Sequence, residues 1–388
     1  MKKIGLLPKL IIAIIIGILI GAFAPEWIVG IFATFNSIFG SFLGFSIPLI
    51  IVGFVAPGIG DLGDGAGKLL AITAGLAYLS TIVAGSLSYF ASSIIFPTFL
   101  KAGSLVTDAS NPEESLLAPF FTIDMPPIFG VMTALLIAFI IGLGIAAIKA
   151  EALKKVMHEF QNIVELLISR IIIPLLPFHI LGIFANMTYA GQVATILSVF
   201  SRVFIMIIAL HIITLVAQFL VSGSIAGANP FRLLKNMMPA YFTAIGTQSS
   251  AATIPVTLAQ TKKNGVKDDV ADFVIPLCAT IHLSGSTITL VACSMAILML
   301  NGISVSFLQI IPFILMLGVT MVAAPGVPGG AVMAALGLLE TMLGFSQPML
   351  SLMIALYIAQ DSFGTATNVT GDGAIAILVN KIKGNKLN

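Results

Sequence analysis

Long stretches without positive charge dominate this chain of 388 residues. No Lys or Arg occurs at residues 268–380, and most apolar runs are close to the roughly 20 residues that a helix needs to cross a bilayer. Charged residues make up only 9% of the sequence, whereas a soluble globular domain has about a quarter. The sequence therefore predicts an all-α polytopic membrane protein.

Six apolar spans precede Pro230, and their order sets the expected topology. They are predicted at residues 9–23, 32–55, 69–96, 127–148, 163–185 and 196–220, with Pro174 and Pro177 expected to bend the fifth. Most Lys residues then fall on one side, so the positive-inside rule places both termini in the cytoplasm. The polar, net acidic segment 101–124 is predicted to be an external loop.

Two later apolar segments are predicted to enter the membrane and return on the same side. Residues 236–261 lie between cytoplasmic charges and are too short for two crossings, which take about 40 residues. Their centre, GTQSSAATIP, has the small and hydroxyl-bearing residues that irregular backbone at membrane depth requires. Residues 307–344, broken by APGVPGG at 324–330, are expected to form a second hairpin that enters from outside.

Each predicted hairpin precedes a long apolar segment with a polar interruption. Residues 271–300 contain ATIHLSGST at 279–287, and residues 346–379 contain QDSFGTATNVTGD at 360–372. Two interrupted segments at corresponding positions of two units are typical of an inverted repeat with a binding site at the midplane. This arrangement, in which each hairpin precedes an interrupted apolar segment, predicts a transporter.

Four polar residues within 360–372 have the spacing of a single helix face. Asp361, Thr365, Asn368 and Asp372 are separated by four, three and four positions, so on a helix they form one narrow stripe. Ionisable groups at membrane depth are costly and usually functional. We interpret the stripe as the wall of a substrate and ion site; a stripe facing a structural water cavity is the alternative.

Other functional classes have weaker support in the sequence. A channel would conduct ions steadily without substrate, and a membrane enzyme would need a nucleophile with a base or a metal set; paired histidines or a Glu-His constellation are absent from the spans. Cys278 and Cys293 are expected to be core residues, and the net charge of +2 gives no indication of nucleic acid. Gly17 and Gly21 predict close helix packing rather than a dimer face.

Several ordered motifs resemble one transporter family over essentially the whole chain. They are NVTGD at 368–372, the serine-rich turn at 247–255, GVPG at 326–329 and IPLCATI at 275–281. They resemble the dicarboxylate/amino acid:cation symporter family, the glutamate transporter homologues. The resemblance implies eight transmembrane helices plus two re-entrant helical hairpins, assembled as an inverted-repeat, elevator-type homotrimer in the cell membrane.

The same resemblance implies a division of the chain into two moving parts. Residues 1–66 would hold scaffold helices 1 and 2, and residues 101–192 an external loop with scaffold helices 4 and 5. Residues 67–100 would form helix 3 of the transport domain. Residues 193–388 would form the core of that domain, comprising helix 6, hairpin 1, helix 7, hairpin 2 and helix 8.

The family's substrate contacts carry over onto matching positions of this sequence. Asp361 resembles the aspartate that holds the substrate ammonium, and Asn368 resembles the asparagine that binds its α-carboxylate. Hairpin-tip contacts to that carboxylate would come from Ser249, Ser250 and the backbone around Val327 and Gly329, since backbone N–H groups suit an anion. Gly364 and Thr365 complete the expected substrate-binding set.

Arginine is absent from the segments that would form the site. Acidic-substrate members place an arginine where this chain has Gly364, or supply a guanidinium from the first hairpin, where this chain has Gln248. A buried substrate carboxylate would lack its bidentate partner. The sequence therefore predicts a small neutral substrate such as serine, threonine or alanine, and QDSxxTAxN resembles the serine/threonine:sodium symporter branch. A larger neutral or sulfur-containing amino acid and, further off, an acidic amino acid remain alternatives.

The resemblance implies a sodium site centred on Asp372, and its chemistry is suitable, since carboxylates and carbonyls are hard oxygen donors that suit an alkali cation. The resemblance adds Asn368 and the backbone carbonyl of His282 as ligands. The family's run of asparagine, methionine, aspartate, glycine and threonine appears here as HLSGS at 282–286, so Ser284 replaces a charged ligand. A second sodium site, with Tyr78 and Thr81 nearby, is therefore expected to be weak or missing.

His282 leaves the coupling ion open between sodium and protons. Histidine has an unperturbed pKa of about 6.5, near physiological pH, so His282 is a candidate proton carrier. The alternative, which we favour, is a neutral histidine that donates to a backbone carbonyl within the broken helix.

Overall fold

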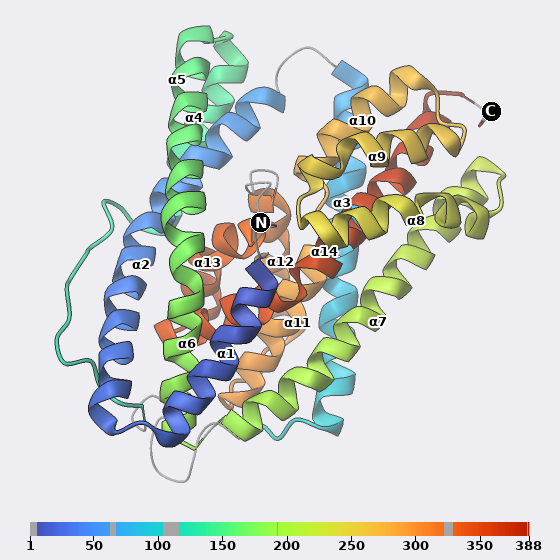
Figure 1. Ribbon diagram of the computed structural model, residues 1–388. Coiled ribbons are helices and arrows are strands. Elements are labelled where there is room, and N and C mark those ends of the chain that lie inside the picture. The colour runs from blue at the N-terminus through green and yellow to red at the C-terminus, as the bar shows by residue number, and fades with distance from the viewer. Residues whose placement is uncertain are drawn as a thin grey trace, which may run out of the picture.

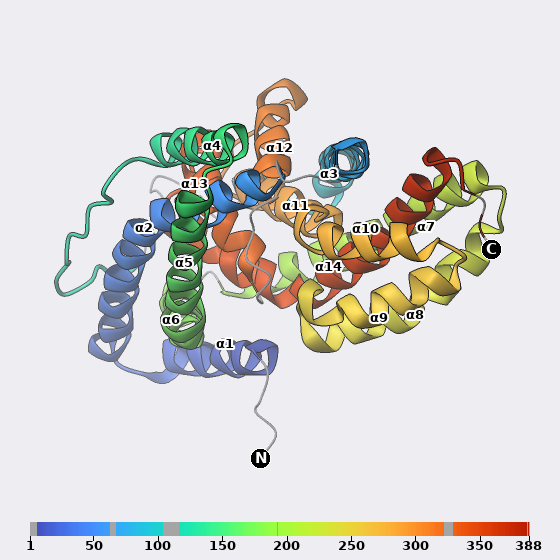
Figure 2. The ribbon, with the colours of Figure 1, turned by 90° about the horizontal axis from the view of Figure 1, so that it is seen from above.

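The computed structural model describes residues 6–62, 67–103, 116–191, 193–321, 329–385 and 387, and within these ranges every regular element is helical. Two groups of helices lie side by side in both views (Figures 1 and 2). The first group consists of α1 (Leu6–Phe23), α2 (Glu26–Leu62), α4 (Val131–Ile148), α5 (Glu151–Leu167) and α6 (Ile173–Tyr189). Within it, α2 packs on α4 and α6, and α1 packs on α6.

The second group is built around the C-terminal helix. Its elements are α3 (Gly67–Ile95) with a 3-10 turn (Phe96–Thr98), α7 (Val193–Ala226), α8 (Pro230–Thr247), α9 (Ser250–Lys263), α10 (Asp268–Ile281), α11 (Ser284–Leu300), α12 (Phe307–Met321), α13 (Gly330–Leu343) and α14 (Gln347–Ile382). Helix α14 contacts α7, α8, α9, α10 and α11, and nearly all of its side chains are buried. A polar residue on α14 therefore faces other protein segments.

The predicted first hairpin is present as α8 and α9. The side chain of Asn229 accepts hydrogen bonds from the amides of Phe231 and Arg232, which satisfies two free N–H groups at the start of α8. Gln248, at φ 53°, ends α8 in the left-handed conformation. Ser249 then caps α9 by accepting from the amide of Ala252. The turn thus lies inside the serine-rich segment that the sequence indicated.

The expected polar break between 279 and 287 is also present. Helix α10 ends at Ile281 and α11 begins at Ser284, and His282 between them has extended backbone. The break frees backbone N–H groups at the start of α11 in the middle of the protein. Buried N–H groups need partners, so this point must be met by polar side chains from other helices.

The second polar interruption does not break its helix, contrary to the sequence-based expectation. Helix α14 runs without a gap through 360–372. Its polar side chains either bond to their own preceding turn, as Thr367 does with the carbonyl of Phe363, or reach neighbouring helices, as Asn368 does. The backbone ladder therefore stays intact, and only one of the two interruptions is a break in the main chain.

The fifth predicted span is longer than expected, and it contains a π-helical turn next to Pro174. Helices α5 and α6 are joined by a π-helical turn at Ile168–Ile172, so helical structure extends from Glu151 to Tyr189. Pro174 is the second residue after that turn. A proline ring clashes with the carbonyl four residues earlier in a regular α-helix, and the wider π turn accommodates it.

Five helical stretches among the described residues are long and apolar enough to cross a membrane. They are Glu26–Pro57, Leu69–Thr98, Glu151–Tyr189, Phe200–Ala226 and Asp268–Leu300, and shorter apolar helices accompany them at Ile11–Phe23, Leu136–Ile148, Phe307–Met321 and Gly330–Leu343. Large apolar side chains such as Ile15, Leu79 and Ile140 are exposed on their outer faces. Such faces suit contact with lipid. The count of eight membrane-spanning helices stays a prediction.

The two groups of helices are linked by a buried histidine. His179 on α6 places its Nε2 3.1 Å from the hydroxyl of Ser351 on α14 and its Nδ1 3.0 Å from the side-chain amide of Asn36 on α2. Next to this link a cavity of about 930 Å³ is lined by α2, α6, α13, α14 and parts of 116–130. The contact between the groups is therefore incomplete on this side.

The paired glycines of α1 serve packing within the chain. A Cβ on Gly17 would lie 2.4 Å from the carbonyl oxygen of Leu181, and one on Gly21 would lie 2.2 Å from that of Ala185. Both neighbours belong to α6 of the same molecule. The preference for close internal packing over a dimer face is confirmed.

We expect Gly21→Ala to lower the free energy of unfolding by about 1–3 kcal/mol, because its methyl group would overlap the α6 backbone. Gly75→Ala on α3 is the matched control, since a Cβ there meets no atom within 4 Å. Thermal unfolding of the purified protein in detergent should show a lower Tm for Gly21→Ala only. Equal Tm values for both variants would contradict the close α1–α6 contact.

Candidate functional site

The polar stripe of α14 lies in the protein interior beside the break between α10 and α11. Asp361, Thr365, Asn368 and Asp372 are each at most 5% exposed. They contact three different parts of the fold, namely the start of α13, the start of α11 and the imidazole at the break. The stripe is thus a meeting point of the second hairpin with the broken helix.

Asn368 satisfies the backbone groups that the break leaves free. Its Oδ1 accepts from the amides of Gly285 at 2.8 Å and Ser286 at 3.3 Å, and its Nδ2 donates to the hydroxyl of Ser286 at 2.9 Å. The side chain acts as a cap supplied from another helix.

Asp361 is held by the N-terminal end of α13. The amide of Gly329 donates to Asp361 Oδ2 at 2.7 Å, and Gly329 has the left-handed φ of 75° that glycine adopts without strain. Thr365, one helical turn further along α14, also interacts with this carboxylate. The amide of Gly329 thus holds one oxygen of Asp361, the residue that the sequence predicts to bind the substrate ammonium.

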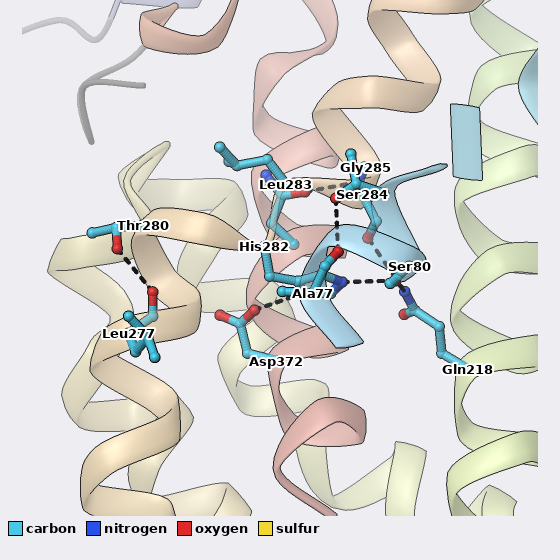
Figure 3. Close-up of polar contacts among 12 residues, drawn as sticks. Ala77, Ser80, Gln218, Leu277, Thr280, His282, Leu283, Ser284, Gly285 and Asp372 are labelled. Carbon is cyan, nitrogen blue, oxygen red and sulfur yellow. Dashed lines mark hydrogen bonds and ion pairs between the residues drawn. The ribbon is translucent and has the colours of Figure 1, made fainter. Parts of the chain in front are cut away.

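Asp372 is paired with His282 (Figure 3). The imidazole Nδ1 lies 2.9 Å from Asp372 Oδ1, and the Nε2 lies 2.9 Å from the hydroxyl of Ser80 on α3. Gln218 of α7 donates from Nε2 to both Ser80 and Ser284. Four helices therefore meet around one histidine.

The favoured interpretation of His282, as a donor to a backbone carbonyl in the break, is wrong. Both ring nitrogens contact side chains, one a carboxylate and the other a hydroxyl. The contact depends on Gly371, because a Cβ there would lie 2.8 Å from His282 Cε1. Sequence alone could not show that the imidazole points back towards α14 rather than along its own helix.

Two buried oxygens in this network have no hydrogen-bond donor. They are Asp372 Oδ2 and Gln218 Oε1. A buried carboxylate needs a compensating charge, which here is either a proton on His282 or a bound cation. The unpartnered Asp372 oxygen is a hard donor of the kind that an alkali ion takes.

The tip of the first hairpin touches α14 next to Asp361. Gln248 donates from its side-chain amide to the hydroxyl of Ser362 at 2.8 Å. Ser249 is used as the cap of α9, and Ser250 is buried at the first position of that helix. Of the second hairpin, Gly329 lies at the site, whereas Val327 lies outside the described residues.

Gly364 is buried against the broken helix. A Cβ at this position would face the backbone of Gly285 and Ser286 at 3.6–3.7 Å, which is ordinary contact distance. In this conformation the position therefore faces the start of α11 rather than open space.

The residues predicted to flank a second sodium site, near Ser284, have separate hydrogen-bond partners. The hydroxyl of Tyr78 donates to the carbonyl of Leu315 on α12, and that of Thr81 donates to Ala77 within its own helix. Ser284 is buried and joins the His282 network only through Gln218. The structure brings Ser284, but not the other two hydroxyls, to the network.

Four residues of the site were not singled out from the sequence: Ser80, Gln218, Ser286 and Tyr357. Gln218 stands alone in the apolar run ITLVAQFLV, and Tyr357 lies one turn before Asp361 on the same face. An isolated amide in a membrane span is a usable signal. Ser80 and Ser286 carry no such signal, because small hydroxyl residues are common in apolar helices.

Comparisons with known proteins identify the family of this chain. The sodium:dicarboxylate symporter family matches residues 6–382. A serine/threonine transporter of Streptococcus suis, SstT, is 28% identical over 86% of this chain and 94% of its own length. The mouse neutral amino acid transporter B(0) is 34% identical over 37% of this chain and 26% of its length. Human excitatory amino acid transporter 2 is 28% identical over 61% of this chain and 42% of its length.

We expect Asn368→Ala to lower the free energy of unfolding by about 1–3 kcal/mol without any ligand, because two buried amides at the start of α11 lose their acceptor. Asn301→Ala, at the other end of α11, is the matched control; that side chain bonds only to its own helix and is partly exposed. Ligand-free thermal unfolding measures both. An equal loss of stability in Asn301→Ala would argue against the capping role of Asn368.

Proposed function

Because this chain belongs to the sodium:dicarboxylate symporter family, we propose that it is a secondary active symporter for a small neutral amino acid. The proposed substrates are serine, threonine or alanine. The substrate ammonium would bind Asp361, and its α-carboxylate would bind near Asn368 and the hairpin ends at Ser249, Ser250 and Gly329.

One observation is the main support for a neutral substrate: no guanidinium group lies at the site. The sequence has three arginines, and all three are exposed and away from α14. Arg170 is in the π turn of the first helix group, Arg202 lies over the ring of Phe99, and Arg232 is in the first turn of α8. A side-chain carboxylate bound beside Asp361 would be buried without a partner, which is strongly unfavourable.

The relatives support the same substrate class. The match to SstT of Streptococcus suis covers nearly all of both proteins, and that protein's name specifies serine and threonine. The neutral amino acid transporter of mouse matches over a shorter region, as does the human excitatory amino acid transporter. The full-length match carries more weight than the partial ones.

Sodium is the proposed co-substrate, bound at Asp372. The unpartnered Asp372 Oδ2 fits a hard cation, and the remaining ligands would be the His282 backbone carbonyl and Asn368. Ser284 is uncharged and stands where the family has an aspartate ligand for another sodium ion. We therefore propose that this protein binds fewer sodium ions than it would with an aspartate at that position.

The mechanism that we propose is an elevator movement in a homotrimer in the cell membrane, with both termini in the cytoplasm. Helices α1, α2, α4, α5 and α6 would form the scaffold, and α3 with α7–α14 would move. The separate packing of these two sets, and the few polar links between them such as His179 to Ser351, support this division.

Proton-coupled symport is a second candidate, favoured by the contact of His282 with Asp372 at 2.9 Å. Here a cationic imidazole would provide the positive charge that sodium provides in the leading proposal. The hydroxyl of Ser80 at the other ring nitrogen would hold the second N–H.

Asp361→Asn should abolish saturable binding of neutral amino acids, because an amide cannot neutralise the substrate ammonium. We expect an affinity loss of at least a hundredfold, in line with about 3 kcal/mol for breaking a buried charge pair. Thermal stabilisation of the purified protein by serine, threonine and alanine measures it. Asp269→Asn, which removes an exposed ion pair with Lys383, is the control. Normal binding by Asp361→Asn would reject the ammonium role.

Uptake into proteoliposomes separates the two coupling ions. Under the sodium proposal, alanine uptake follows an inward sodium gradient, stops in choline, and needs more sodium in Asp372→Asn. Under the proton candidate, uptake persists in choline, follows an inward proton gradient, and loses that dependence in His282→Asn. Sodium-independent uptake with no pH dependence would exclude both.

A further inference from the structure

Tyr357 carries a buried hydroxyl whose hydrogen bonding the fold leaves incomplete. Its side chain is 0% exposed, and its hydroxyl has no hydrogen-bond partner. It lies on α14 four residues before Asp361, so the two side chains share one face of the helix. Buried hydroxyls are nearly always paired, and each exception needs a physical reason.

The side chains beside this hydroxyl also bond to other parts of the site. Tyr357 interacts with Asp361 and Ser286, although neither contact has the full geometry of a hydrogen bond. Asp361 Oδ2 accepts from the amide of Gly329 at 2.7 Å, and the hydroxyl of Ser286 accepts from Asn368 at 2.9 Å. The tyrosine oxygen therefore borders this polar cluster without a well-formed hydrogen bond to any of its members.

A phenylalanine would fill the same space without an unpaired oxygen. The hydroxyl therefore costs stability in the substrate-free protein, and a ligand that pairs with it would recover that cost. The ligand most suited to this position is one that also binds Asp361.

We propose that Tyr357 determines specificity by binding the side-chain hydroxyl of the substrate. This inference rests on the proposed function, in which Asp361 holds the ammonium group. In serine and threonine only three bonds separate the ammonium nitrogen from the hydroxyl oxygen, so both groups reach one helix face. A phenol donates and accepts, and it pairs with a hydroxyl in either direction. The transporter would then prefer hydroxyl amino acids to apolar ones of equal size.

The substrate pair threonine and valine isolates this contact, because the two have the same shape and differ in one hydroxyl. Serine and 2-aminobutyrate form a second pair. In the unmodified protein we expect tighter binding of threonine than of valine, by roughly tenfold or more, as one buried hydrogen bond provides. Isothermal titration on the purified full-length protein gives both affinities. Equal affinities would overturn the proposal without any variant.

Tyr357→Phe should remove the preference. We expect the threonine-to-valine affinity ratio to fall towards one while valine and alanine bind as before. The control is Tyr89→Phe, whose hydroxyl donates to the carbonyl of Val305 at 3.0 Å, outside the site. An unchanged ratio in Tyr357→Phe, or an equal fall in Tyr89→Phe, would overturn the assignment.

Ligand-free stability separates this role from a structural one. Tyr357→Phe removes an unpaired oxygen, so its Tm without substrate should equal or exceed that of the unmodified protein. Tyr89→Phe removes a hydrogen bond, and its Tm should fall. A marked loss of Tm in Tyr357→Phe would show a structural role and overturn the proposal. Alanine binding without hydroxyl preference would reject this inference alone, whereas absence of all neutral amino acid binding would reject the proposed function.

Discussion

The need to satisfy buried polar groups governs the centre of this protein. Helix α14 carries two carboxylates, an amide and several hydroxyls in a position where almost none of its surface meets solvent. Each of these groups needs a partner from the protein or from a ligand. The break between α10 and α11 adds free backbone amides at the same depth, and Asn368 meets them. The helix break and the polar stripe therefore depend on each other, although they lie about eighty residues apart in the chain.

The two buried carboxylates have different hydrogen-bond partners. Asp361 is met by the amide of Gly329 at the start of α13, and Asp372 by the imidazole of His282. An ammonium group that binds Asp361 must share its oxygens with that amide, so binding at Asp361 is connected to the position of the second hairpin. A cation at Asp372 must likewise share the carboxylate with His282. In the proposed function, binding of each ligand would therefore act on contacts that hold separate helices together.

The proposed selectivity depends on a group that the site lacks. With all three arginines exposed elsewhere, a second substrate carboxylate would have no partner, so the proposed substrate is a zwitterion with a neutral side chain. Among the described residues, the unpartnered oxygens of Asp372 and Gln218 and the hydroxyl of Tyr357 are site groups without a full hydrogen bond. The first two suit a cation, and the last suits a neutral polar group.

The sequence by itself determined the helical membrane class, the first hairpin, the break at His282 and the placement of four polar residues on one face of α14, because these follow from local periodicity, charge and turn chemistry. It did not determine which side chains meet across helices. The pairing of His282 with Asp372, the roles of Ser80 and Gln218, and the continuity of α14 were decided by tertiary structure. The physical reason is that a buried polar group takes whichever partner the packing of distant helices brings within hydrogen-bonding distance, and local sequence carries no record of that choice.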